Sequence, residues 1–159
     1  MAAASDISWS GPSGTFNLRA AAIICRGDEI LLCTVDGLGY WFLPGGRVRF
    51  GEPGSAALAR ELAEELGHQL RIGDLSFVVE NIFAGDGAEH EIGLYYRVDW
   101  PSVLDPEDLR RGSEVGHRFG WTGVQMLASV GFQPARLVPV LQTRPATLKH
   151  AVLNHSEPQ

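Results

Sequence analysis

Three glutamates lie within five residues of the chain, at Glu61, Glu64 and Glu65. In an α-helix, residues three and four apart share a face, so Glu61 would lie beside both of the others. Carboxylates this close repel one another unless a cation lies between them. Oxygen ligands select hard ions such as Mg²⁺ or Mn²⁺, and a protein-bound Mg²⁺ usually keeps open positions for water and phosphate oxygens. The spacing therefore predicts a metal-dependent site for a phosphate-containing substrate.

The residues around these glutamates predict an amphipathic helix that positions them. Pro53 suits the first turn, where its missing N–H would be unpaired in any case, and Gly67 is a typical residue at a helix C-terminus. Leucines recur every four residues and form the expected buried stripe, at Leu58, Leu62 and Leu66, supported by Ala59 and Ala63. The glutamates lie alongside this stripe, so the helix can pack inward and still hold a metal at its edge.

This segment resembles the Nudix box, whose pattern is G-x5-E-x7-R-E-U-x-E-E-x-G-U, where U is a bulky aliphatic residue. The matching residues are Gly46, Glu52, Arg60, Glu61, Leu62, Glu64, Glu65 and Gly67. His68 stands where the last aliphatic residue belongs, and this departure bears on local packing because His68 lies beyond the carboxylates. An acidic, solvated helix face would not explain Leu43-Pro44-Gly45-Gly46 just upstream, or the placing of Glu52.

The resemblance implies both a fold and a reaction. Nudix proteins share an α/β/α sandwich, an α/β fold with a mixed sheet and a catalytic helix. Nudix enzymes generally hydrolyse a nucleoside diphosphate linked to another group, by attack of water on phosphorus with a divalent metal bound. The implied protein is a Mg²⁺- or Mn²⁺-dependent pyrophosphohydrolase whose substrate is a small nucleoside diphosphate derivative.

The resemblance also assigns roles to the matching residues. The implied metal ligands are Glu61, Glu64, Glu65 and the backbone carbonyl of Gly45, since the family uses the residue just before the box glycine. Arg60 and Glu52 are expected to orient the glutamates rather than to contact the substrate. The general base is left open between a box glutamate and Glu114, which matches a glutamate on a later loop of some members.

Other candidate binding residues have an equally ordinary structural reading. Arg47 and Arg49 alternate along the chain after the glycines, so one could bind phosphate, or both could be exposed strand charges. His90-Glu91 begins a zinc-protease motif that fails at Leu94, so both are expected to be strand residues near the site. Three aromatic residues could stack on a base or could belong to the core: Tyr40, Phe83 and Tyr95.

Two other functions fit the same scaffold. A Nudix domain that senses a nucleotide without catalysis would be expected to lose box glutamates or to carry a DNA-binding module, and neither is seen. An isopentenyl-diphosphate-isomerase-like enzyme would need a catalytic cysteine, but Cys25 and Cys33 have no supporting motif. Markers of the ADP-ribose, dinucleoside polyphosphate and coenzyme A subgroups are absent, so the substrate class stays open.

Bulk properties restrict the partners and the location. A length of 159 residues favours one domain, and a net charge of −6 without a basic stripe argues against a nucleic-acid polymer as partner. No apolar run would span a membrane, and the N-terminus lacks the pattern of a secretory signal. Unpaired cysteines in a reducing cytoplasm are expected. Many family members are dimers, so a homodimer stays open, and Trp9 would be one interface candidate.

The remaining pattern divides the chain into three parts. We expect a flexible N-terminal arm at 1–16, a hydrolase domain at 17–145 and a loose C-terminal tail at 146–159. Within the domain, strands are predicted at 18–26, 29–35, 40–43, 75–84, 90–100 and 116–121. Short helices are predicted at 124–128 and 134–142, turns at Gly27-Asp28 and Gly85-Asp86-Gly87, and one helical turn after Pro106.

Overall fold

The computed structural model describes residues 4–83, 87–104, 116–144 and 148–154. An eight-stranded mixed sheet forms its centre, with the order β7-β3-β2-β6-β5-β8 along the main path, while β1 and β4 also pair with β2. The strands are β1 (Ser8–Gly11), β2 (Gly14–Arg26), β3 (Glu29–Val35), β4 (Gly45–Arg47), β5 (Ile72–Phe83), β6 (Glu89–Asp99), β7 (His117–Gly123) and β8 (Lys149–Asn154).

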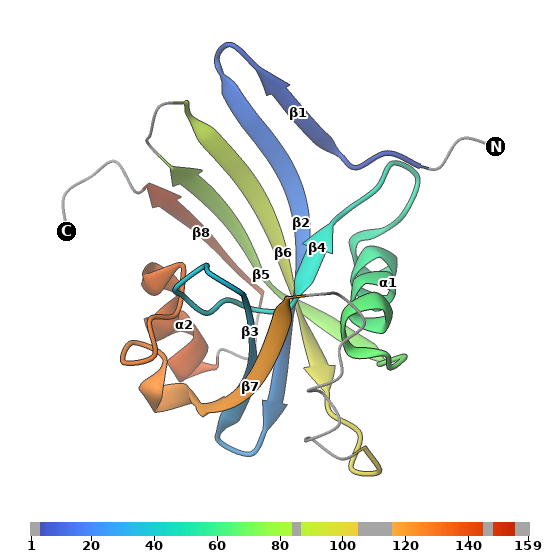
Figure 1. The fold of residues 1–159 in the computed structure, drawn as a ribbon, viewed down its shortest axis with the longest axis vertical. Helices are drawn as coiled ribbons and strands as arrows, with labels where there is room; N and C mark the ends of the chain where they lie inside the picture. The colour runs from blue at the N-terminus through green and yellow to red at the C-terminus, as the bar shows by residue number, and fades with distance from the viewer. Residues whose placement is uncertain (1–3, 84–86, 105–115, 145–147, 155–159) are drawn as a thin grey trace.

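Helices cover both faces of this sheet, as Figure 1 shows. Helix α1 (Gly54–Leu66) lies on one face, and the other face is covered by η2 (Val124–Met126), η3 (Ala135–Leu137) and α2 (Val138–Thr143). Ala20 and Ala22 of β2 belong to the buried cluster under α1, whereas Ala21 belongs to the cluster under α2. Buried residues that alternate between two cores require a covered sheet on both sides. The predicted α/β/α sandwich with a mixed sheet is therefore confirmed.

Most predicted elements are found close to their expected positions. Helix α1 begins after Pro53 and ends at Gly67, which adopts the left-handed conformation with φ 72°. In the first hairpin Cys25 pairs with Ile30, as expected from a turn at Gly27-Asp28. Cys25 is a free thiol of intermediate exposure, and Cys33 is buried. The longest ladder is parallel and joins β2 to β6 from Thr15↔Glu89 to Cys25↔Asp99, so it fixes the centre of the sheet.

The strand next to the glycines is displaced from its predicted position. We expected a strand at 40–43 that ended at Pro44-Gly45-Gly46, but the regular strand is β4, Gly45–Arg47. Before it, Trp41 and Phe42 form only isolated bridges. The two glycines pair with Ala21 and Ala20 of β2. A Cβ on Gly45 would lie 2.2 Å from the Ala20 carbonyl oxygen, so this pairing requires glycine.

One segment of the expected flexible arm and one segment of the expected loose tail form strands of the sheet. Residues 8–11 form β1, which pairs with β2 through Trp9↔Phe16, although the Trp9 side chain remains 55% exposed. Residues 149–154 form β8, which runs parallel to β5. These segments gain hydrogen bonds from distant strand edges, a contribution that local sequence patterns do not reveal. The Gly85-Asp86 turn and the helical turn after Pro106 lie outside the described residues.

Among the helices in the described ranges, none is long and apolar enough to cross a membrane.

Shortening a buried leucine of α1 should destabilise the whole domain. Leu62 is fully buried against the sheet, so Leu62→Ala should lower the free energy of unfolding by about 2–5 kcal/mol. Met126→Ala, at an exposed side chain, should change it by less than about 0.5 kcal/mol. Urea denaturation followed by circular dichroism measures both. Equal effects of the two substitutions would contradict the packing described for α1.

Candidate active site

Strand β4 and helix α1 meet at a very close contact between Gly46 and Glu61. A Cβ built on Gly46 would lie 2.2 Å from both Cδ and Oε2 of Glu61. The residue after it, Arg47, offers its backbone carbonyl to Arg60 Nη2 at 3.1 Å. The absence of a side chain at Gly46 therefore lets β4 pass directly beside the first carboxylate of the helix.

Arg60 organises the charged residues of this region. Its Nη2 donates to Glu52 Oε1 at 2.7 Å, and its Nε donates to Glu52 Oε2 at 3.3 Å. Its Nη1 donates to Glu61 Oε1 at 2.6 Å and, more weakly, to Glu64 Oε2 at 3.5 Å. Glu52 in turn accepts the backbone N–H of Arg49 at 2.8 Å. One guanidinium thus links the loop before the helix to two of the three glutamates.

The electrostatics of this network favour the charged forms of both partners. Hydrogen bonding from the Arg60 guanidinium lowers the pKa of Glu52 below its usual 4.5; partial burial opposes this shift and the Arg49 N–H adds to it. The hydrogen bond to Glu52 likewise raises the pKa of Arg60, with Glu61 adding to the shift. The pair is therefore ionised across the whole neutral range.

The three box glutamates occupy different environments. Glu61 is half-buried beside Gly46, Glu64 is exposed, and Glu65 is only 4% exposed. Within the described residues, no three side chains of His, Cys, Asp or Glu are grouped closely enough to hold a metal ion. The donor set still suits a hard divalent cation, because it consists of carboxylates next to glycine backbone. A bound cation would compete with Arg60 for Glu61 and Glu64.

Arg19 occupies the position next to the expected backbone ligand. Its Nη2 donates to the Gly45 carbonyl at 2.8 Å and to the Leu43 carbonyl at 3.4 Å. Its guanidinium carbon lies 5.5 Å from the centre of the Phe42 ring. The Gly45 carbonyl, which we expected as a metal ligand, therefore already accepts a hydrogen bond from a charged side chain.

A cavity of ≈ 540 Å³ opens on the α2 side of the sheet, next to Arg19. Its volume is in the range of small-molecule sites. Aromatic side chains make up much of its wall, at Tyr40, Phe42, Phe83, Tyr95 and Phe132. Polar side chains also reach it, at Arg19, Asn81, Glu91 and Gln133. Such a lining suits a flat, partly polar group such as a nucleobase.

Of the other candidate binding residues from the sequence, some line the cavity and others do not. Arg47 and Arg49 both lie 3.8 Å from Asp6 of the N-terminal segment and do not line the cavity. Glu91 lines the cavity, whereas His90 lies 3.7 Å from Glu80. Tyr40, Phe83 and Tyr95 are all part of the cavity wall. Glu114 lies outside the described residues.

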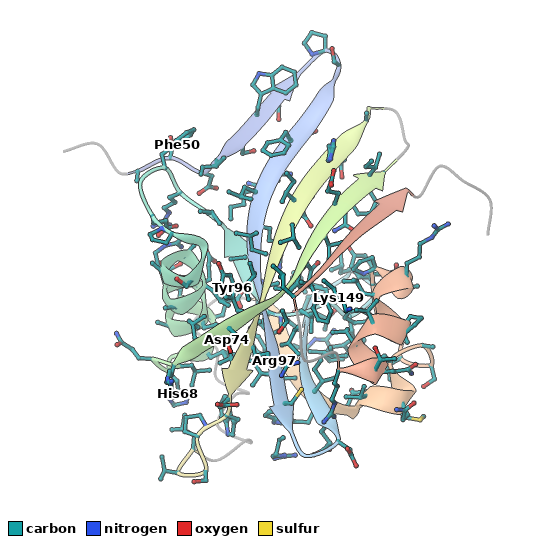
Figure 2. The ribbon with its side chains drawn as sticks, turned by 180° about the vertical axis from the view of Figure 1, so that it is seen from behind. Phe50, His68, Asp74, Tyr96, Arg97 and Lys149 are labelled. Atoms are coloured by element: carbon teal, nitrogen blue, oxygen red, sulfur yellow. The ribbon has the colours of Figure 1, made fainter. Side chains whose placement is uncertain are left out.

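His68 packs where the motif has an aliphatic residue. Its ring meets that of Trp100 edge-to-face with 6.2 Å between ring centres, and Figure 2 shows His68 beyond the end of α1. A ring in this position replaces the packing of an aliphatic side chain. The departure from the motif thus concerns the core contacts of the helix end, as expected.

Two polar cavity residues, Arg19 and Asn81, were not singled out from the sequence. Arg19 is the one polar residue of LRAAAII, and Asn81 follows Glu80 in the otherwise apolar stretch FVVENIF. A polar side chain in such a strand is the one local signal that could have identified them. Only the pairing of β2, β5 and β6 brings them to one cavity.

Comparisons with known proteins agree with the motif. A model of the NUDIX domain family matches residues 15–141. A Mycobacterium tuberculosis protein described as a putative 8-oxo-dGTP diphosphatase 2 is 63% identical over 60 residues, which is 35% of this chain. The aligned stretch spans 41% of that relative's length.

Solved structures show the same fold. The MutT NUDIX hydrolase from Burkholderia pseudomallei is 34% identical, with a TM-score of 0.58, covering 69% of this chain and 84% of that one. The MutT protein from Bacillus halodurans has a TM-score of 0.66 at 15% identity, covering 89% and 93%, and its likeness concerns the fold alone.

The salt bridge between Arg60 and Glu52 should make stability depend on acid pH. Because the folded pKa of Glu52 is lowered, its stabilisation is complete above the unfolded value near 4.5 and disappears as pH falls through the folded value. Glu52→Gln should therefore lower Tm clearly at pH 7 and hardly at all at the lowest pH where the fold persists. Thermal melts of both proteins across this range measure the difference. A Tm deficit that does not change with pH would contradict the coupling.

Alanine substitutions at Gly45 and Gly46 should affect different properties, the first stability and the second metal affinity. Gly46→Ala should leave stability nearly intact, because its Cβ meets the flexible end of Glu61, while metal affinity falls about 10- to 100-fold. Gly45→Ala should instead destabilise the protein, because its Cβ meets backbone and its φ is +139°. Calorimetry of Mn²⁺ binding and thermal melts measure both. Gly87→Ala, with nothing within 4 Å, is the control.

Proposed function

The chain belongs to the Nudix hydrolase family, and from this premise we propose that it hydrolyses the phosphoanhydride of a nucleoside diphosphate linked to another group, using a divalent metal. The observation that carries the proposal is the close contact between Gly46 of β4 and the carboxylate of Glu61. It supports a site in which carboxylates of α1 act next to the backbone of β4. Hard cations such as Mg²⁺ or Mn²⁺ prefer this chemistry.

The proposed metal ligands are Glu61, Glu64, Glu65 and the carbonyl of Gly45. A divalent cation held by these residues would supply charge neutralisation for the phosphates and Lewis acidity for the attack of water on phosphorus. Arg60 and Glu52 orient the carboxylates, which the Arg60 hydrogen bonds to Glu61 and Glu52 support. The general base remains a choice between a box glutamate and Glu114.

The cavity on the α2 side is the proposed binding site for the nucleoside. Arg19 connects it to the turn, since one guanidinium lines the cavity and donates to the Gly45 carbonyl. A substrate with its base in the cavity could therefore extend its phosphates past Arg19 towards Glu61. Arg47 and Arg49 are proposed as phosphate ligands only if the substrate displaces them from Asp6.

The names of the relatives favour nucleoside triphosphates as the first substrates to test. One relative is described as a putative 8-oxo-dGTP diphosphatase, although it aligns over only 60 residues. The B. pseudomallei structure is described as a MutT NUDIX hydrolase. Unmodified and 8-oxo nucleoside triphosphates, sugar nucleotides, ADP-ribose and dinucleoside polyphosphates form the first panel of substrates.

Removing the charge of Glu61 should abolish hydrolysis without unfolding the protein. Wild type and Glu61→Gln would be assayed on this panel with Mg²⁺, with Mn²⁺ and with EDTA, and nucleotide products would be separated by chromatography. We expect metal-dependent turnover of one class by the wild type and a loss of at least about 100-fold in the variant. Glu29→Gln, on an exposed hairpin remote from α1, is the matched control. Unchanged turnover by Glu61→Gln, or full activity in EDTA, would reject the proposal.

A further inference from the structure

Asn81 and Glu91 face each other across the central strands at the polar side of the cavity. They are direct partners in the β5·β6 ladder, and Asn81 Nδ2 donates to Glu91 Oε1 at 3.2 Å. Both line the cavity. Asn81 is 1% exposed, so the hydrogen bond holds the Glu91 carboxylate beside an almost completely buried amide.

This pair offers hydrogen-bond acceptors that the protein leaves unused. Asn81 Oδ1 is buried and has no hydrogen-bond partner among the described residues. Glu91 uses one acceptor position for Asn81, and in the described part of the chain no cation lies within salt-bridge distance of it. A buried acceptor without a donor is costly, so a ligand that supplies N–H groups would relieve this cost.

Tyr95 lines the same cavity as Asn81 and Glu91. A Cβ on Gly93 would lie 2.5 Å from its ring, so the glycine lets the ring lie flat against β6 between Glu91 and the core. Burial raises the pKa of Tyr95 to about 12, and the charge of Glu91 contributes to the rise. The phenol therefore stays protonated and adds an aromatic surface beside the carboxylate.

We propose that Asn81 and Glu91 read the base of the substrate and select guanine, through the two adjacent N–H donors of its pairing edge. This inference rests on the proposed function, because it treats the cavity as the nucleoside site. A carboxylate accepts two parallel hydrogen bonds from N1–H and N2–H of guanine. Adenine and cytosine present a donor beside an acceptor, and thymine presents one donor between two acceptors, so each would leave an acceptor facing the carboxylate.

Other residues of the cavity also suit guanine. The oxygen on C6 of guanine needs a donor, and Arg19 is the cationic donor that lines the same cavity. Phe42, Phe83 and Phe132 provide apolar walls for the ring. Selectivity thus comes from the acceptors of β5 and β6, whereas the aromatic walls accept any base.

Removing one donor from the ligand tests the proposal without altering the protein. The nucleotides dGTP and dITP differ only in the exocyclic amino group, so wild type should prefer dGTP by about 10-fold or more in kcat/KM. dATP, dCTP and dTTP should be poorer still. Equal kcat/KM for dGTP and dITP would overturn the proposal.

Substitution of Glu91 tests whether this residue carries the preference. Glu91→Gln keeps an oxygen for Asn81 Nδ2 but replaces the second acceptor by a donor, so the ratio of dGTP to dITP should fall to nearly one. Glu89→Gln makes the same change two residues earlier on β6, at an exposed position outside the cavity, and should keep the wild-type ratio. A ratio that survives in Glu91→Gln would overturn the assignment, since a purely structural role would change both substrates alike.

Calorimetric binding of dGMP and dIMP separates this inference from the proposed function. If no nucleotide is hydrolysed but dGMP still binds more tightly than dIMP, and Glu91→Gln removes the difference, then base selection stands and the hydrolase proposal fails. If nucleotides are hydrolysed without base preference, the hydrolase stands and base selection is overturned. Loss of both hydrolysis and discrimination rejects both.

Discussion

The arrangement of the site depends on one guanidinium, that of Arg60. It is bonded to Glu52 through two nitrogens, to the Arg47 carbonyl and to Glu61. Through Glu52, which accepts the Arg49 N–H, the same group fixes the loop between β4 and α1. An arginine fork suits this task because its planar donors have fixed directions. Without it, Glu61 and Glu64 would lose this counter-charge.

A second constraint is the close packing of backbone around the glycine turn. Gly45 approaches the backbone of Ala20 and Ala21 in β2, so β4 can pair with β2 at this point only without a side chain, and Gly46 approaches the flexible end of Glu61 in α1. The hydrogen bond from Arg19 to the Gly45 carbonyl extends this packing to the cavity on the other face. β4 therefore connects the Glu61 carboxylate on the α1 side of the sheet with the cavity on the α2 side.

The two faces of the sheet have different roles in the proposed function. On the α1 face, charged residues gather at the edge of a helix whose leucines are buried. On the α2 face, β2, β5 and β6 supply a cavity with aromatic walls and one pair of polar residues, Asn81 and Glu91. Asn81 is buried and its Oδ1 has no hydrogen-bond partner among the described residues, which costs stability, and the proposed ligand would offset this cost.

The sequence by itself determined the elements whose signals are local. Leucine spacing with Pro53 and Gly67 defined α1, and the motif placed the glutamates on it, because helix periodicity is written within a few turns. Only the tertiary structure decided which strands adjoin: β1 and β8 join the sheet edges, and β6 lies parallel to β2, through bonds to residues far away in the chain. For the same reason Arg19, Asn81 and Glu91 meet at one cavity only in the fold, since cross-strand neighbours depend on register, which no short stretch of sequence encodes.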